Sequence, residues 1–393
     1  MEVTMVEAIT RETEFAPGKT LKLETGRLAK QADGSVVVRL GETMVLCTAV
    51  ISNEIREGQN FFPLTVDYRE KYSAGGKIPG GFIKREGRPT DKEVLSSRLV
   101  DRAIRPLFPD GFYNEVQIIV YVISADGAND ADVLAGVGSS AALLLAGAPF
   151  DGPISEVRIG RVDGQFIVNP TIQELANSDF NLVVAGKDDA IVMVEGEMDE
   201  VSEEEVLEAL DLAHDAIRQI NAIQRALVEG KGDVRPREYE AVTVPQALVD
   251  MIYDRVGKKM SDHIRAPYEK QAFYSGIGVI KDEVVVELLG KDDPAGGSVR
   301  AAATPEGYTE RQIREAVGIV ESRVMREMIL QDGHRLDGRG LRDIRPIWCE
   351  VGYLPRVHGS AIFTRGETQV LASVTLGTTR DVQAVDQIFD TTD

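Results

Sequence analysis

The chain has 393 residues, and its 44 basic and 64 acidic side chains give a net charge of −20. A chain this acidic repels nucleic acid on average, so any nucleic-acid contact must use a local basic patch. With 43% hydrophobic and 27% charged residues, the composition is that of a soluble globular protein of two or three domains.

The N-terminus does not have the character of a targeting segment. Residues 1–11 carry three charged side chains among short apolar stretches, which is unlike a secretory signal. The longest apolar run, residues 141–150, is interrupted by Gly147 and Pro149 and is too short to cross a bilayer. We therefore expect a cytoplasmic protein without a membrane partner.

A strand, a tight turn and a second strand are predicted near the N-terminus and again far along the chain. The segment from Gly34 to Leu46 recurs 325 residues later with seven of thirteen positions identical, including the Gly-Glu-Thr turns at Gly41 and Gly366. Upstream, Gly26 corresponds to Gly352 at an offset of 326, so one residue was gained or lost between these points. The long spacing indicates duplicated domains.

One basic island interrupts the acidic chain between Arg69 and Arg105, where ten basic residues face five acidic ones. Its first part, residues 74–85, is rich in glycine and presents Phe82 beside Lys84 and Arg85. A mobile loop with a ring and adjacent cations suits single-stranded nucleic acid, because the ring stacks on a base and the cations hold phosphates.

The second part of the island, residues 93–105, has arginines at helical steps of four and three: Arg98, Arg102 and Arg105. Such a row can grip phosphates through its guanidinium groups. The alternative is a solvated basic helix whose arginines pair with Asp91, Glu93 and Asp101.

Alternating strands and helices continue the first copy. Strands are predicted at residues 116–124, 180–185 and 190–194, and helices at residues 132–148 and from Ser202 to about Gly230. The second helix starts with a capping box of Ser202 and Glu205. This pattern predicts an α/β or α+β domain over residues 1–235.

A mostly helical domain is predicted for residues 236–330, with helices at 244–260 and 310–329, a short apolar segment at 281–290 and a loop at 292–297. The second copy occupies residues 331–393 and is much shorter than the first, so it is truncated in this chain. Either the chain is a fragment or the rest of the second copy was lost.

Motifs for nucleotide binding and metal binding are incomplete in this sequence. Gly76-Lys77 does not have the first glycine of a P-loop, and Gly276-Ile277-Gly278 does not have the third glycine of a dinucleotide fingerprint. The four histidines are scattered, and the two cysteines, Cys47 and Cys349, exclude a cysteine-based zinc cluster.

Three stretches together resemble bacterial polynucleotide phosphorylase: Arg335-Leu336-Asp337-Gly338-Arg339, the two Gly-Glu-Thr hairpins, and the basic segments at 80–89 and 99–109. The resemblance covers the N-terminal portion of that family. It implies a duplicated RNase PH-like core of the α/β (α+β) class, with a mostly helical linker domain between the copies.

The resemblance also implies a function. The family degrades messenger RNA from 3′ to 5′ by phosphorolysis: inorganic phosphate is the co-substrate, nucleoside diphosphates are released, and the reaction reverses to make polymer. The family uses magnesium and forms a ring-shaped homotrimer that acts on single-stranded RNA. The resemblance also implies components of an RNA-degradation complex as protein partners.

Carried onto this sequence, the resemblance implies seven RNA-binding residues. Phe82 would stack on a base, Lys84, Arg85 and Arg88 would contact phosphates, and Arg98, Arg102 and Arg105 would guide the strand. The family's loop commonly has two aromatics followed by two arginines. Here Ile83 and Lys84 stand in two of these places, which predicts a looser grip.

The resemblance places the catalytic and magnesium-binding residues in the second core, beyond Asp393. The first copy's counterpart of the phosphate loop, residues 125–132, is acidic and has no hydroxyl groups, so it should repel phosphate. We therefore expect this chain to supply an RNA-guiding first core without an active site. The alternative is a non-catalytic RNA-binding scaffold subunit of a ring. A single-copy enzyme that trims transfer RNA is disfavoured by the duplication.

Overall fold

The computed structural model describes residues 8–56, 59, 61–80, 84–289, 307–381 and 388. Phe82, Ile83, the predicted loop at 292–297 and most of the last twelve residues lie outside these ranges. The chain divides into two compact units, one formed by Met1–Val242 with Val385–Asp393 and one formed by Thr243–Ala384. Each unit is described by itself.

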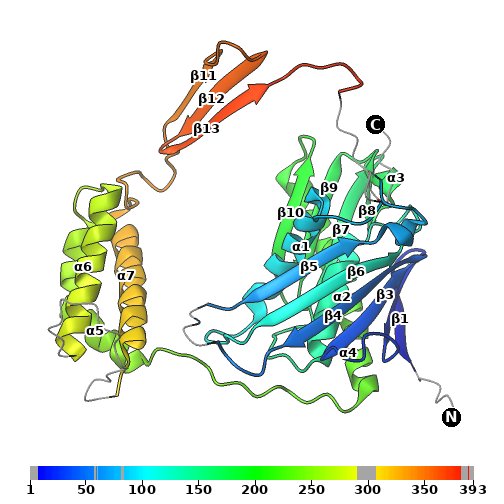
Figure 1. Ribbon diagram of the computed structural model, residues 1–393, viewed down its shortest axis with the longest axis horizontal. Helices are drawn as coiled ribbons and strands as arrows, with labels where there is room; N and C mark the ends of the chain where they lie inside the picture. The colour runs from blue at the N-terminus through cyan, green and yellow to red at the C-terminus, as the bar shows by residue number, and fades with distance from the viewer. Residues whose placement is uncertain are drawn as a thin grey trace. The chain divides into compact units, whose positions relative to one another are not determined.

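The first unit contains two β-sheets (Figure 1). The larger sheet has six strands in the order β1-β2-β3-β4-β6-β5, and its strands pair antiparallel except for β5 and β6. The smaller sheet has four antiparallel strands in the order β10-β9-β7-β8. The strands are β1 (Ile9–Ala16), β2 (Lys19–Thr25), β3 (Gly34–Leu40), β4 (Thr43–Ile51), β5 (Leu64–Glu70), β6 (Val116–Ser124), β7 (Ser155–Val162), β8 (Gln165–Val168), β9 (Phe180–Gly186) and β10 (Ile191–Met198).

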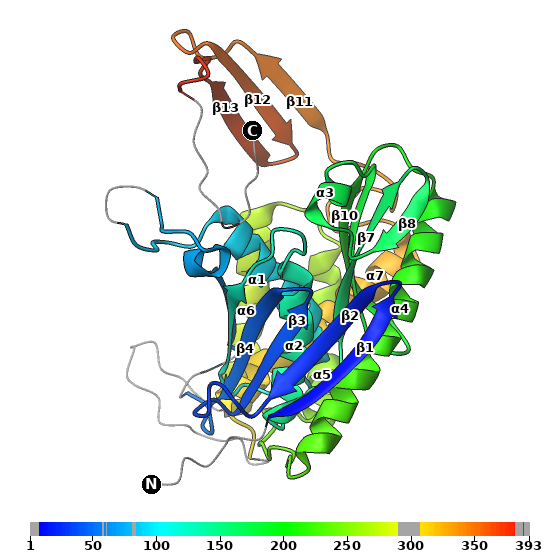
Figure 2. The same ribbon diagram turned by 90° about the vertical axis from the view of Figure 1, so that its right-hand side faces the viewer.

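Helices α2 and α4 contact both sheets, and Figure 2 shows α4 running along β1 and β2. The predicted capping box of α4 is present, and the helix ends at Lys231, with Gly230 inside it and Gly232 as its cap. The helical segments of this unit are η1 (Tyr72–Gly75), α1 (Asp91–Ile104), η2 (Arg105–Leu107), α2 (Asp132–Leu145), α3 (Ile172–Leu175) and α4 (Glu203–Lys231).

Close packing of α2 on the large sheet depends on glycines. A Cβ at Gly138 would lie 2.4 Å from the Cys47 sulfur, and a Cβ at Gly34 would lie 1.9 Å from the Ala142 carbonyl oxygen. Helix and strands therefore approach more closely than larger residues would permit. Cys47 is fully buried in this contact.

The carboxyl group of Glu156 on β7 is buried against α2 without a hydrogen-bond partner. The side chain is 1% exposed, and both its oxygens are unpaired within the described residues. A Cβ at Gly136 would lie 2.2 Å from the carboxyl carbon, so this glycine makes the space for the group. Burial raises the pKa of Glu156 to about 8, helped by Asp132 and opposed by Arg158.

The predicted duplication is visible in the strand register. In the first copy Leu40 pairs with Thr43 and Leu23 with Val38; in the second, Arg365 pairs with Thr368 and Cys349 with Phe363. The hairpin pairs are 325 residues apart, while the upstream strand is shifted by 326, as the sequence predicted. The extra residue is therefore absorbed in the turn before the hairpin.

The second unit contains a three-helix bundle and a three-stranded antiparallel sheet. Ion pairs join neighbouring helices, including Arg255–Glu287 at 2.9 Å and Lys281–Glu321 at 3.1 Å. The described part of the apolar segment, residues 281–289, is the C-terminal part of α6, in which Val284 and Val285 are buried in the bundle core. The elements are α5 (Gln246–Ile264), α6 (Lys270–Leu289), α7 (Glu310–Asp332), β11 (Ile347–Val351), β12 (Gly359–Arg365) and β13 (Thr368–Val374).

Among the described residues, no helix comparable to α2 packs on the sheet of the second copy. The side chains of β11 and β13 are exposed throughout. A Cβ at Gly359, the counterpart of Gly34, would approach nothing more closely than Val374 at 3.8 Å. None of the helices in the described ranges is both long enough and apolar enough to span a membrane.

Glu156→Gln is expected to flatten the pH dependence of stability. Because the pKa of Glu156 is higher in the folded chain than its unfolded value of about 4.3, the stability from its protonated form is complete below that pH and is lost as the pH rises through about 8. The stability difference between variant and wild type should therefore grow by up to about 1.4 kcal/mol per pH unit in this window.

The measurement is urea denaturation across this pH window, followed by hydrogen exchange of the α2 and β7 amides. Asp110→Asn is a control for the loss of a carboxylate, because Asp110 is exposed. Parallel pH profiles of wild type and Glu156→Gln would contradict a buried, protonated Glu156.

Candidate nucleic-acid interface

Helix α1 carries Arg98 and Arg102 of the arginine row, Arg105 follows directly after it, and the helix begins with a capping box. Thr90 Oγ1 accepts a hydrogen bond from the Glu93 amide at 3.2 Å, and the Glu93 carboxylate accepts one from the Thr90 amide at 2.6 Å. The pattern Thr-x-x-Glu is visible in the sequence and fixes where the helix starts.

The inner side of α1 lies against β5, an edge strand of the large sheet. The Glu70 amide donates to Glu93 Oε1 at 2.8 Å, and the Tyr68 amide donates to Ser97 Oγ at 3.0 Å. Alternate strand residues are about 6.7 Å apart and helix positions four apart rise about 6 Å, so the two spacings match. Side chains of α1 therefore accept hydrogen bonds from the backbone amides at the outer edge of β5.

Arg105 extends this contact to the start of β5. Its guanidinium group binds both Asp101 oxygens, at 2.6 and 2.9 Å, and donates to the carbonyl oxygens of Phe62 and Leu64 at 3.1 and 3.2 Å. Four of its N–H donors therefore have intramolecular acceptors. Glu93, Ser97, Asp101 and Arg105, which follow each other at steps of four, are called the α1 clamp below.

The outward side of α1 carries the other two arginines of the row. Arg102 forms an ion pair with Glu195 on β10. Arg98 is exposed and has no hydrogen-bond or ion-pair partner within the described residues. The arginine row is therefore divided, and Arg98 is the member whose donors are available to an external phosphate.

The loop before α1 presents further cations to solvent. Lys84, Arg85 and Arg88 are exposed, and no ion pair involves them in the part of the chain that the structure describes. Lys84 has a positive φ of 55°, which turns the backbone sharply where the described loop begins. Phe82 lies outside the described residues, so its predicted stacking role stays a prediction.

Other basic residues of the island serve the fold. Arg69 pairs with Glu93 at 3.5 Å, and Lys71 pairs with Glu86 at 2.7 Å. Lys92 lies between Glu70, at 3.0 Å, and Asp130, at 3.2 Å. Burial works against the charged form of Lys92, but these carboxylates raise its pKa above the usual value, so it stays charged. These three cations are therefore occupied by intramolecular carboxylates, and two of them, Arg69 and Lys71, lie outside the helix.

In the loop at 125–132, the carboxylate of Asp126 occupies the backbone donors. Asp126 accepts hydrogen bonds from the amides of Glu42, Ala128 and Asn129 at 2.8 to 3.0 Å and from Thr43 Oγ1 at 3.0 Å. Burial works against the charged form, but these donors hold the pKa of Asp126 well below its usual range. The backbone donors that could have held a phosphate are therefore occupied.

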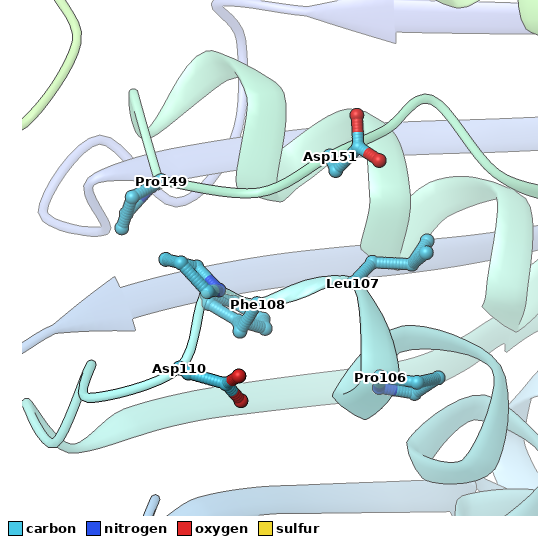
Figure 3. A pocket seen from close by; sticks show the side chains of 7 residues that line it. Pro106, Leu107, Phe108, Asp110, Pro149 and Asp151 are labelled. Atoms are coloured by element: carbon cyan, nitrogen blue, oxygen red, sulfur yellow. The ribbon is translucent and has the colours of Figure 1, made fainter. Parts of the chain in front are cut away.

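A groove of about 510 Å³ lies beyond the C-terminal end of α1 (Figure 3). Prolines and Phe108 form much of its wall, and Asp110 and Asp151 contribute carboxylates. None of its lining residues is basic, so it does not favour a phosphate-bearing ligand.

The described residues contain no group of three or more histidine, cysteine, aspartate or glutamate side chains placed to hold a metal ion. Near the phosphate-loop counterpart, Asp130 is paired with Lys92 and Asp132 with Arg158. These residues therefore do not fit the magnesium ion that the resemblance implies.

Family models match most of the chain. The 3′ exoribonuclease family, domain 1, matches residues 18–149 and 343–391, and domain 2 of the same family matches residues 152–216. The two domain 1 segments start at the offset of the internal repeat. The chain belongs to the 3′ exoribonuclease family, and the predicted RNase PH-like fold is confirmed.

The more specific relatives are polyribonucleotide nucleotidyltransferases. The protein of that name from Salinibacter ruber is 61% identical over 387 residues, and the one from Chlorobaculum tepidum is 48% identical over 389 residues. Each alignment covers 98% of this chain and 53% of the relative, so the chain spans about half the length of the curated relatives it matches. The predicted resemblance to the N-terminal portion of polynucleotide phosphorylase is confirmed.

Two further comparisons concern single parts of the chain. Residues 247–340, which include the helical bundle, match a family model described as the RNA binding domain of polyribonucleotide nucleotidyltransferase. Among solved structures, the crystal structure of rice (Oryza sativa) Rrp46 aligns with a TM-score of 0.43 and 15% identity, covering 57% of this chain and 95% of that chain.

Arg98→Ala and Arg105→Ala are expected to act differently. Arg98→Ala should weaken binding of a single-stranded oligoadenylate and reduce the slope of log affinity against log salt by about 0.7, the contribution of one phosphate contact. Arg105→Ala should leave that slope unchanged. It should lower the free energy of unfolding by roughly 1 kcal/mol, because the hydrogen bonds from Arg105 to the carbonyl oxygens of Phe62 and Leu64 are lost.

Fluorescence anisotropy titrations at several salt concentrations and urea denaturation measure the two effects. A reduced salt slope for Arg105→Ala with unchanged stability would reverse the assignment of these two arginines.

Proposed function

We propose that this chain is the RNA-guiding part of a phosphorolytic 3′ to 5′ exoribonuclease that degrades messenger RNA. The observation that carries the proposal is the set of exposed cations without partners in the described residues, which lie on one loop and one helix: Lys84, Arg85, Arg88 and Arg98. Family membership supplies the class of reaction, and these cations supply a surface for the polyanionic substrate.

The proposed reaction consumes inorganic phosphate. A phosphate oxygen attacks the phosphorus of the terminal phosphodiester, the bond to the 3′ oxygen of the preceding nucleotide breaks, and a nucleoside diphosphate leaves. The shortened RNA keeps a 3′ hydroxyl group, so the cycle can repeat or run in reverse. Residues of this chain act before that step, by holding phosphates of the incoming strand through charge-assisted hydrogen bonds.

We place the phosphate and magnesium sites outside residues 1–393, in the part of the longer relatives that this chain does not cover. Two observations support this placement. The Asp126 carboxylate occupies the donors of the first copy's loop, and the acids beside it are paired with Lys92 and Arg158. Magnesium, when bound there, would stabilise negative charge on the reacting phosphates.

Single-stranded RNA is the proposed partner, because exposed cations on a loop suit a flexible backbone. A cytoplasmic homotrimer, with RNA-degradation complex components as further partners, is proposed from the resemblance. A non-catalytic scaffold subunit is not favoured, because the relatives that match 98% of the chain are named as nucleotidyltransferases. The RNA-binding assignments of Phe82, Lys84, Arg85, Arg88 and Arg98 and the domain boundaries at 235 and 330 belong to the same proposal, whereas Arg102 and Arg105 are assigned to intramolecular contacts.

Residues 1–393 alone are expected to bind oligoadenylate but to release no nucleoside diphosphate from polyadenylate with phosphate and magnesium. The reason is that the first copy offers neither a phosphate site nor a metal site in its described residues. Thin-layer chromatography of radiolabelled products measures the release. If nucleoside diphosphate is released, and mutation of the loop at 125–132 abolishes that release, the active site lies in the first copy and this division of roles is wrong.

A further inference from the structure

One acidic residue lies inside the basic loop. Residues 84–88 contain three exposed cations and Glu86, whose side chain is only 28% exposed. By charge alone, a carboxylate at this position should oppose RNA binding, because it cancels part of the local positive potential. Its contacts indicate a different role.

Glu86 ties the loop to the end of β5. Its Oε2 atom lies 2.7 Å from Lys71 Nζ, and its Oε1 atom accepts a hydrogen bond from the Tyr72 amide at 3.2 Å. The next residue, Gly87, accepts a hydrogen bond from the Arg69 guanidinium group at 2.8 Å. The hydrogen bond from Lys71 is the main reason that the pKa of Glu86 is below its usual value, so the carboxylate is ionised.

The residues that hold Glu86 are themselves fixed to the sheet. Arg69 belongs to β5, and its Nε atom lies 3.5 Å from Glu93 of the α1 clamp. The Lys71 ammonium group lies 4.7 Å from the centre of the Tyr121 ring on β6. The anchor point of the loop is therefore connected both to the sheet and to the helix that carries Arg98.

We propose that Glu86 is a positioning residue for single-stranded RNA: it fixes the loop so that Lys84, Arg85 and Arg88 are held in place before RNA arrives. This inference rests on the proposed RNA-binding function. A loop without this anchor would have to be ordered during binding, and the lost conformational freedom would be subtracted from the affinity. The electrostatic cost of the carboxylate is reduced because Lys71 pairs with it at 2.7 Å.

An electrostatic role and a positioning role of Glu86 predict opposite changes in RNA affinity for the same substitution, so the proposal can be tested. Glu86→Ala adds one unit of positive charge to the loop, so a purely electrostatic role predicts tighter RNA binding. Positioning predicts that binding of a fluorescent oligoadenylate weakens by about threefold to tenfold at about 0.1 M salt. Glu86→Gln should have a smaller effect, because its amide oxygen can still accept from the Tyr72 amide.

Asp91→Ala is the matched control. Asp91 belongs to the same basic island, is exposed and has no ion pair within the described residues, so its removal changes the charge equally without releasing the loop. It should leave affinity unchanged or raise it by less than about twofold. Thermal denaturation of each variant establishes that the fold is retained, which is expected because these positions lie outside the buried core.

A double-mutant cycle with Lys71→Met provides a second, independent measurement. If Glu86 acts through Lys71, Glu86→Ala should lose most of its weakening effect in the Lys71→Met background. Tighter binding by Glu86→Ala, equal to that of Asp91→Ala, would overturn the positioning role, as would an unchanged effect of Glu86→Ala in the Lys71→Met background.

Arg85→Ala separates this outcome from a failure of the proposed function. If Arg85→Ala lowers affinity and salt slope while Glu86→Ala binds more tightly, the RNA interface stands and Glu86 is not its anchor. If Arg85→Ala, Arg88→Ala and Arg98→Ala all leave the affinity unchanged, the RNA interface itself is wrong, and the role of Glu86 falls with it.

Discussion

Strand β5 lies at the edge of the large sheet, and the α1 clamp supplies the hydrogen-bond partners for its outer side. Glu93 and Ser97 accept from the amides of Glu70 and Tyr68, while Arg105 donates to the carbonyl of Leu64. These polar contacts fix both the position and the rotation of α1. Since Arg69 of β5 and the two residues directly after the strand hold the basic loop, this strand sets the positions of Lys84, Arg85 and Arg88 as well as that of Arg98.

The elements that could be predicted from sequence are those in which the local backbone preference and the hydrophobic pattern indicate the same structure. The Gly-Glu-Thr turns place Gly41 and Gly366 at positive φ, and strand alternation flanks each of them. Helix α4 could be located from its capping box and its apolar stripe, because its buried face is apolar along most of its length. In these elements local preference and tertiary packing act in the same direction.

The division of the basic island could not be predicted, because it depends on contacts between residues that are distant in sequence. Arg98 and Arg105 are equivalent in a helical pattern, yet Arg105 reaches a strand that begins about forty residues earlier. The buried side of α1 is polar at Glu93 and Ser96, so hydrophobic periodicity does not reveal which face packs. Glu86 counts as an opposing charge in the sequence, and its anchoring contact with Lys71 appears only in three dimensions.

Over the three strands that both copies share, the copies differ in length in the turn before the hairpin, where the offset changes from 326 to 325. A residue inserted within a strand would have exchanged the two faces of the sheet for every position beyond it. Sequence divergence after the duplication was therefore restricted by the strand register. Side chains such as Val38 and Phe363 could be replaced, whereas the pairing frame beneath them was inherited intact, so changes in length could accumulate only between strands.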